Sequence, residues 1–143
     1  MILNSHLSGD GADGNRLYPE AVDPRVLSPQ TLAFIGDGVY ELMVREKLVC
    51  EANRPAGALH RLSVSLVRAE AQAQAAKRIL PLLSEEELAV FRRGRNAHTA
   101  RTDPDYHSAT ALEALFGYIY LRGDIDRLRA LFAHSMEDTG SGL

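Results

Sequence analysis

The pattern of apolar positions predicts a central helix between residues 32 and 49. Apolar residues recur there at helical spacing and cover nearly every face. One face carries Leu32, Ile35, Val39 and Met43, and the opposite face carries Phe34, Val44 and Leu48. A helix that is apolar all round is typical of a buried position. Ser28 and Pro29 supply a capping serine and a first-turn proline for its start.

Four further helical stretches follow. Residues 56–80 form an alanine-rich segment with apolar residues at helical spacing, which predicts one long helix. Residues 84–87 have the Ser-x-x-Glu form of a capping box and predict a helix start. Residues 106–121 predict a strongly apolar helix, and Asp124 begins the last one. No stretch shows a β pattern, so the chain is predicted to be all-α, with about five helices.

Composition and length place the chain among globular proteins with one domain. It has 143 residues, of which 45% are hydrophobic and 24% charged. Residues 1–25 are rich in glycine and polar residues without apolar periodicity, and they are predicted to form a flexible tail. Residues 26–139 are then predicted to form the single folded domain.

Charge and cysteine content limit the cellular compartment and the class of protein that the sequence fits. The single cysteine, Cys50, excludes an internal disulfide framework and fits a reducing cytoplasm. No apolar run approaches the roughly 20 residues of a membrane span. A net charge of −3 argues against a protein that coats nucleic acid through bulk charge, although it allows a local basic surface.

Asp37 is the unusual residue of the first helix. It lies inside the apolar run, with Gly36 and Gly38 on either side and Glu41 one turn away on the same stripe. Burying an unpaired carboxylate costs several kcal/mol, so Asp37 requires a partner or a metal. Each glycine costs roughly 1 kcal/mol in a helix, which favours close approach of a backbone or ligand. An ion pair with a core arginine is the structural alternative.

Glu113 is the single acidic residue of the apolar helix at residues 106–121. It shares its face with small residues, including Ala109 and Gly117, so another helix could approach closely. If the two apolar helices cross, Asp37 and Glu113 meet, and both stay ionised in a dry site only with a cation between them. Carboxylate oxygens with water ligands describe a Mg²⁺ site. A hydrogen-bonded acid pair is the structural alternative.

A basic segment lies between the two apolar helices. Its candidate phosphate ligands are Arg92, Arg93, Arg95, Asn96, His98 and Arg101, with Arg61 and Arg68 of the alanine-rich segment as a second set. A basic helix end that runs into a polar loop suits phosphate binding. Together with the carboxylates it predicts a phosphodiester substrate, and a merely solvated basic loop stays open as the alternative.

These motifs resemble a known family. Phe34-Ile35-Gly36-Asp37-Gly38-Val39 resembles the signature helix of ribonuclease III, which carries a Phe-Leu-Gly-Asp-Ala pattern. Residues 110–117, Thr-Ala-Leu-Glu-Ala-Leu-Phe-Gly, resemble the second acidic helix of that family, and order and separation also fit. The run Arg-Gly-Arg-Asn-Ala at 93–97, the short length and the lack of an appended RNA-binding domain resemble its Mini-III subgroup. The resemblance covers residues 27–139.

The resemblance implies roles for individual residues. Asp37 and Glu113 match the catalytic carboxylates that bind Mg²⁺, for which Mn²⁺ can substitute. The chain departs from the family's further acids, since Gln30, Ala33 and Thr110 stand at three of those positions. The number of metal ions is therefore open. Glu41 and Thr110 are candidates for contacts behind the metal ligands, with a surface salt bridge as the alternative for Glu41.

The resemblance also implies a function. It describes a cytoplasmic, all-α homodimer that cuts both strands of duplex RNA and leaves 5′-phosphate ends and short 3′ overhangs. The implied substrate is precursor 23S ribosomal RNA, and a ribosomal protein is a candidate helper. The first rival is a non-catalytic RNA-binding or ribosome-assembly module of the same fold. The second, an all-α nucleotide pyrophosphohydrolase, needs more acids at helical spacing than this chain shows.

Overall fold

The computed structural model describes residues 15–97 and 103–137 of the chain. The helices, in chain order, are η3 (Pro24–Val26, a 3₁₀ turn), α1 (Pro29–Glu51), α2 (Ala56–Val67), α3 (Ala69–Ile79), η4 (Leu80–Leu82, a 3₁₀ turn), α4 (Glu85–Arg95), α5 (Pro104–Leu121) and α6 (Ile125–Ser135). No strand occurs within the described residues. The prediction of an all-α fold is confirmed.

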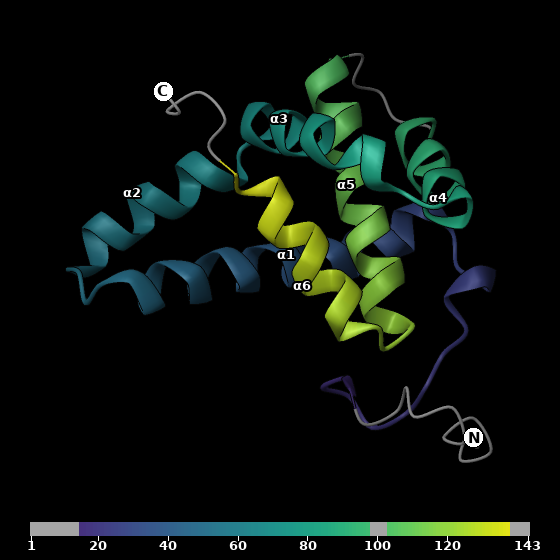
Figure 1. Cartoon of the computed structure of the whole chain (residues 1–143), viewed down its shortest axis with the longest axis horizontal. Coiled ribbons are helices and arrows are strands. Elements are labelled where there is room, and N and C mark those ends of the chain that lie inside the picture. Colours follow the sequence, from purple (N-terminus) through teal and green to yellow (C-terminus); the bar gives the residue numbers. More distant parts are fainter. Residues whose placement is uncertain (1–14, 98–102, 138–143) are drawn as a thin grey trace.

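Helix α5 is the centre of the core. It is buried along most of its length and packs against α1, α3, α4 and α6. Figure 1 shows α5 crossing α1 in the middle of the molecule, with α3 and α4 flanking it. The largest fully buried side chains around this crossing include Leu32, Tyr40, Val44, Leu112, Leu115 and Phe116. The two apolar helices predicted to cross therefore do so.

Glycines permit the crossing of α1 and α5. A Cβ atom at Gly36 would lie 1.6 Å from the backbone oxygen of Glu113, and one at Gly117 would lie 2.1 Å from the backbone oxygen of Leu32. Only glycine fits at either position, because backbone meets backbone there. Gly38 differs, since a Cβ placed on it would meet no atom within 4 Å. No contact within the described chain therefore explains why a glycine, with its cost in helix stability, stands at position 38.

The predicted single helix over residues 56–80 is broken in the structure. Arg68 is extended (φ −65°, ψ 158°) and separates α2 from α3. α2 packs along α1, whereas α3 packs on α5 and α6, so one straight helix could not make both sets of contacts. Apolar spacing continues across Arg68, which is why the sequence pattern did not reveal the break.

One face of α1 is exposed, contrary to the prediction that the helix is buried all round. Phe34 is 82% exposed, Leu42 54% and Val49 63%. The buried residues of α1 lie on the opposite side, where they meet α5. The described part of the chain therefore presents an apolar surface on α1 that none of its other elements covers.

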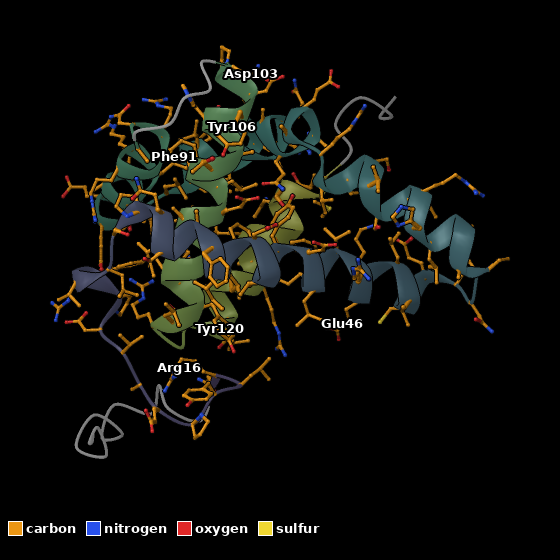
Figure 2. The ribbon with its side chains drawn as sticks, turned by 180° about the vertical axis from the view of Figure 1, so that it is seen from behind. Arg16, Glu46, Phe91, Asp103, Tyr106 and Tyr120 are labelled. Atoms are coloured by element: carbon orange, nitrogen blue, oxygen red, sulfur yellow. The ribbon has the colours of Figure 1, made fainter. Side chains whose placement is uncertain are left out.

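The described part of the N-terminal segment contacts the turn between α5 and α6. Asn15 Nδ2 donates to the backbone oxygen of Gly123 (3.0 Å), and the Leu17 amide donates to Tyr120 Oη (2.7 Å). Figure 2 shows Tyr120 and the segment with Arg16 at this end of α5. Gly123 adopts φ 82°, which suits glycine at the turn. Within the described ranges, no helix has the length and apolar character needed to span a membrane.

Candidate active site

Asp37 extends from α1 next to the crossing and is exposed to solvent. Partial burial raises the pKa of Asp37, and the negative charge of Glu41 raises it further. Among the described residues no basic side chain forms an ion pair with it. The alternative in which a core arginine neutralises Asp37 therefore finds no support in the part of the chain that is described.

Glu113 occupies the facing position on α5. Its backbone oxygen touches Gly36, the neighbour of Asp37. Burial raises the pKa of the Glu113 carboxyl to about 7, and the charge of Asp37 adds to the rise. The same charge pair is what the sequence predicted, because each carboxylate disfavours ionisation of the other. The structure thus brings Asp37 and Glu113 into one site, while their catalytic roles stay predictions.

The chemistry of this pair fits a hard divalent cation. Without a cation, the raised pKa keeps the Glu113 carboxyl partly protonated near neutral pH. Mg²⁺ commonly binds through one or two carboxylates and keeps several water ligands. In the described ranges no group of three or more Asp, Glu, His or Cys side chains is placed to hold a metal. Within the described residues, Asp37 and Glu113 are therefore the two carboxylates that could bind the metal here.

Glu41 and Thr110, the two residues predicted to support the metal-binding carboxylates, form hydrogen bonds with other groups. Glu41 accepts a hydrogen bond from Arg45 Nη2 (2.8 Å) in an exposed ion pair. It acts on Asp37 only through its charge. The Thr110 hydroxyl donates to the backbone oxygen of Tyr106 (3.0 Å) within its own helix. Neither side chain makes a described hydrogen bond to Asp37 or Glu113.

Gln72 of α3 is a polar neighbour of Glu113 that the sequence analysis missed. Its amide lowers the pKa of the Glu113 carboxyl, against the effects of burial and Asp37. The side chain is buried although it is polar. A glutamine on the inward face of an alanine-rich helix was the available signal, but only the structure shows what lies opposite.

The basic end of α4 lies beside the acidic part of α5. A Cβ on Gly94 would come within 2.9 Å of Ala114 Cβ and 3.5 Å of the Thr110 backbone oxygen, so the α4 terminus is pressed against α5 next to Glu113. Arg92, Arg93, Arg95 and Asn96 are exposed there. Figure 2 labels Phe91 of α4 and Tyr106 of α5, and these two helices pack against each other. The structure therefore gathers this part of the predicted phosphate-binding set near the carboxylates.

The other predicted phosphate ligands are placed differently. Arg61 is exposed on α2. Arg68 lies at the break between α2 and α3, where it pairs with Glu70 (3.4 Å). His98 and Arg101 lie outside the described residues. Arg93 donates to the backbone oxygen of Leu27 (3.3 Å), which ties α4 to the start of α1.

Comparison with known proteins identifies relatives over most of the chain. The family model described as "Ribonuclease III domain" matches residues 30–124. A Mini-ribonuclease 3 of Thermoanaerobacter sp. is 47% identical over 116 residues, which cover 78% of this chain and 82% of that protein. A Mini-ribonuclease 3 of Kosmotoga olearia is 39% identical over 133 residues, with coverage of 91% and 92%. A crystal structure of a Fusobacterium nucleatum protein superposes with a TM-score of 0.70 at 30% identity, covering 79% of this chain and 94% of that one.

Proposed function

The chain belongs to the ribonuclease III family, in its Mini-ribonuclease III group, and from this endoribonuclease membership we propose a magnesium-dependent enzyme that cuts double-stranded RNA. One observation carries the proposal. Asp37 and Glu113 are held together at a helix crossing where only glycine fits, and the charge of Asp37 adds to the cost of ionising Glu113. A site that raises the pKa of both carboxyls, that of Glu113 to about 7, suits a cation as the natural partner.

Asp37 and Glu113 would hold the cation, with Mg²⁺ as the expected metal and Mn²⁺ as a substitute. When bound there, Mg²⁺ would neutralise both carboxylates and activate a water molecule for attack on phosphorus. Hydrolysis with departure of the 3′ oxygen leaves a 5′-phosphate on the downstream product. Glu113 must lose its proton before it can act as a ligand, so the site favours the loaded state as the pH rises through about 7.

The basic end of α4 is proposed to bind the RNA backbone. Arg92 and Arg95 are exposed beside α5, and Asn96 ends the helix. Duplex RNA is recognised by shape and through phosphate and 2′-hydroxyl contacts, so a few arginines suffice without reading the bases. This part of the proposal rests on the contact between Gly94, near the end of α4, and Ala114, the residue after Glu113 on α5.

The exposed apolar face of α1 supports a homodimer. Phe34 protrudes from this face, and beside it lies a hollow of about 350 Å³ whose lining includes Ile35, Leu42, Met43 and Ile125. Gly38 lies in the lining with open space above it. A two-fold axis would place Phe34 of each subunit on the other's apolar surface, since such interfaces are self-complementary. Contiguous exposed apolar surface of this kind typically marks an interface.

The biological substrate is proposed from the group to which the chain belongs. We take it to be precursor 23S ribosomal RNA in the cytoplasm, with a ribosomal protein as a candidate helper. Mapping the ends that the protein produces on a transcript of the precursor stem tests this choice. Cuts at scattered positions, or only in unrelated duplexes, would contradict it.

Cleavage of a long labelled RNA duplex, with and without Mg²⁺, tests the enzymatic proposal. We expect the wild type to cut the duplex and to spare a single strand of the same sequence. Asp37→Asn and Glu113→Gln should bind the duplex without cutting it. Glu85→Gln is the matched control, because Glu85 is an exposed acid at the far end of α4. A wild type that binds duplex RNA but never cuts it with any divalent metal would favour the non-catalytic RNA-binding module.

A further inference from the structure

Gln72 presents a buried side-chain amide whose orientation is fixed. The residue is 3% exposed and lies on the inner face of α3. Its Nε2 donates a hydrogen bond to the backbone oxygen of Val67 (2.8 Å), at the end of α2. Because a carbonyl can only accept, the nitrogen must face Val67, and the amide cannot be turned over without losing this bond.

The other atom of the amide, Gln72 Oε1, is also buried but accepts no hydrogen bond from a described protein group. Leaving a buried acceptor unsatisfied costs about 1–3 kcal/mol, so native structures rarely tolerate it. The basic side chains of α3 are used elsewhere: Arg78 donates to the Ser135 backbone oxygen (2.8 Å), and Arg68 at the helix break pairs with Glu70. Something other than these residues must donate to Oε1.

Helix α3 packs on α5, and the amide of Gln72 lies close enough to the Glu113 carboxyl to lower its pKa by hydrogen bonding. Tyr40, from α1, is the other buried polar neighbour that senses the charge of Glu113. Glu113 is therefore reached from three helices: by Asp37 and Tyr40 of α1, by its own α5, and by Gln72 of α3. Gln72 Oε1 and Tyr40 Oη are the two buried side-chain oxygens of this group that no described hydrogen bond satisfies, and Oε1 is the one that can only accept.

We propose that Gln72 is a positioning residue of the active site, which holds the Glu113 carboxylate and whose Oε1 accepts a hydrogen bond from a water molecule of the hydrated cation. The inference deepens the proposed function and rests on it. It places a neutral oxygen from α3 in a site that has only two acids, where the family pattern has more. Partners behind the ligands typically contribute about 10–100-fold to metal affinity or activity.

Binding of Mn²⁺ to the RNA-free protein, followed by the EPR signal of free Mn²⁺, tests this role without an activity assay. Gln72→Met keeps the size of the side chain but removes both polar atoms. We expect it to weaken Mn²⁺ binding by about 10-fold or more. Gln72→Glu keeps an oxygen acceptor and should bind Mn²⁺ more tightly than Gln72→Met.

Ile79→Val is the matched control, because Ile79 is fully buried on α3 and loses one methyl group. It should leave Mn²⁺ binding unchanged, although it destabilises the fold by roughly 0.5–1.5 kcal/mol. In cleavage assays Gln72→Met should need more Mg²⁺ for half-maximal rate, while the KM for duplex RNA stays near the wild-type value. All variants are measured below their unfolding transitions, which circular dichroism locates.

Two results would overturn the inference. If Gln72→Met binds Mn²⁺ as tightly as the wild type, Gln72 serves only to donate a hydrogen bond to the Val67 backbone oxygen at the end of α2. If Ile79→Val loses as much affinity as Gln72→Met, the effect is general loosening of α3. A wild type that cuts duplex RNA while the Gln72 variants match it keeps the proposed function and loses this inference alone. A wild type that neither binds Mn²⁺ nor cuts overturns both.

Discussion

Replacing Gly36 by alanine should break the α1–α5 crossing. The added Cβ would lie 1.6 Å from the Glu113 backbone oxygen and 2.9 Å from the Gly117 backbone nitrogen. Both are backbone atoms, so no rotamer change relieves the clash. The helices must move until the closest contact exceeds about 3.0 Å, the lower limit for Cβ contacts.

The magnitude follows from two opposing effects. Alanine in place of a helical glycine would gain about 1 kcal/mol in helix propensity. Overpacking typically costs 1–3 kcal/mol, and here separation of the helices also opens the core around Leu32, Tyr40, Leu112 and Phe116. Because no rotamer relieves a clash between backbone atoms, we take the upper end of that cost and expect Gly36→Ala to lower the free energy of unfolding by about 2 kcal/mol or more.

Gly38→Ala is the matched control, because the same change there meets no atom within 4 Å. It should leave the fold unchanged or stabilise it by up to about 1 kcal/mol. Urea unfolding followed by circular dichroism at a fixed protein concentration measures both variants. Gly36→Ala should also fail to cut RNA, since Asp37 and Glu113 would be drawn apart. A Gly36→Ala protein within 1 kcal/mol of the wild type would refute the reasoning from backbone contact.

Three further predictions concern pH, salt and assembly. In the folded protein without metal, the pKa of Glu113 is about 7, compared with an ordinary value of 4.5. Between these two pH values Glu113 holds more protons in the folded state than in the unfolded chain. The free energy of unfolding should therefore fall as the pH rises through that window. Glu113→Gln should remove most of this fall in urea titrations at pH 5 and pH 7.5, and an unchanged slope would contradict it. Cleavage should weaken steeply as the KCl concentration rises. Arg92→Ala and Arg95→Ala should each reduce, by about 1, the slope of the logarithm of the RNA-binding constant against the logarithm of the salt concentration. Lys77→Ala, at an exposed site on α3, should leave this slope unchanged. Phe34→Asp should yield monomers in sedimentation velocity, whereas Leu82→Asp, at a 41% exposed site on η4, should behave as the wild type; a Phe34→Asp dimer would count against the α1 surface.

The parts of the fold that local rules determine were predictable from the sequence. Ser28 caps α1, and Ser84 and Glu87 form the expected capping box at α4, with each side chain bonded to the other's backbone amide. The crossing at Gly36 and Gly117 was also foreseeable, because glycine in an apolar helix favours close approach of another backbone, although neighbouring Gly38 makes no such contact. That crossing brings Asp37 and Glu113 together, so the centre of the site could be predicted.

The remaining features depend on what packs against what. Apolar periodicity cannot distinguish a core residue from one that faces a partner, so exposed Phe34 was assigned to the core. The break at Arg68 arises because α2 and α3 lean on different helices. Gln72 had no motif to mark it, and its neighbour Glu113 lies 41 positions away in the chain. Each depends on tertiary contacts that propensity and spacing do not encode.

The contact between the backbones of α1 and α5 has a consequence for how this protein can change over evolutionary time. Where side chains set the distance between helices, each substitution in the core shifts the elements by a fraction of an ångström. Here the separation at the site is set by Gly36 against Glu113, and no side chain intervenes. Leucines, valines and aromatics elsewhere along the crossing can therefore be exchanged while the two carboxylates keep their spacing. We therefore expect substitutions in this core to accumulate away from Gly36 and Gly117.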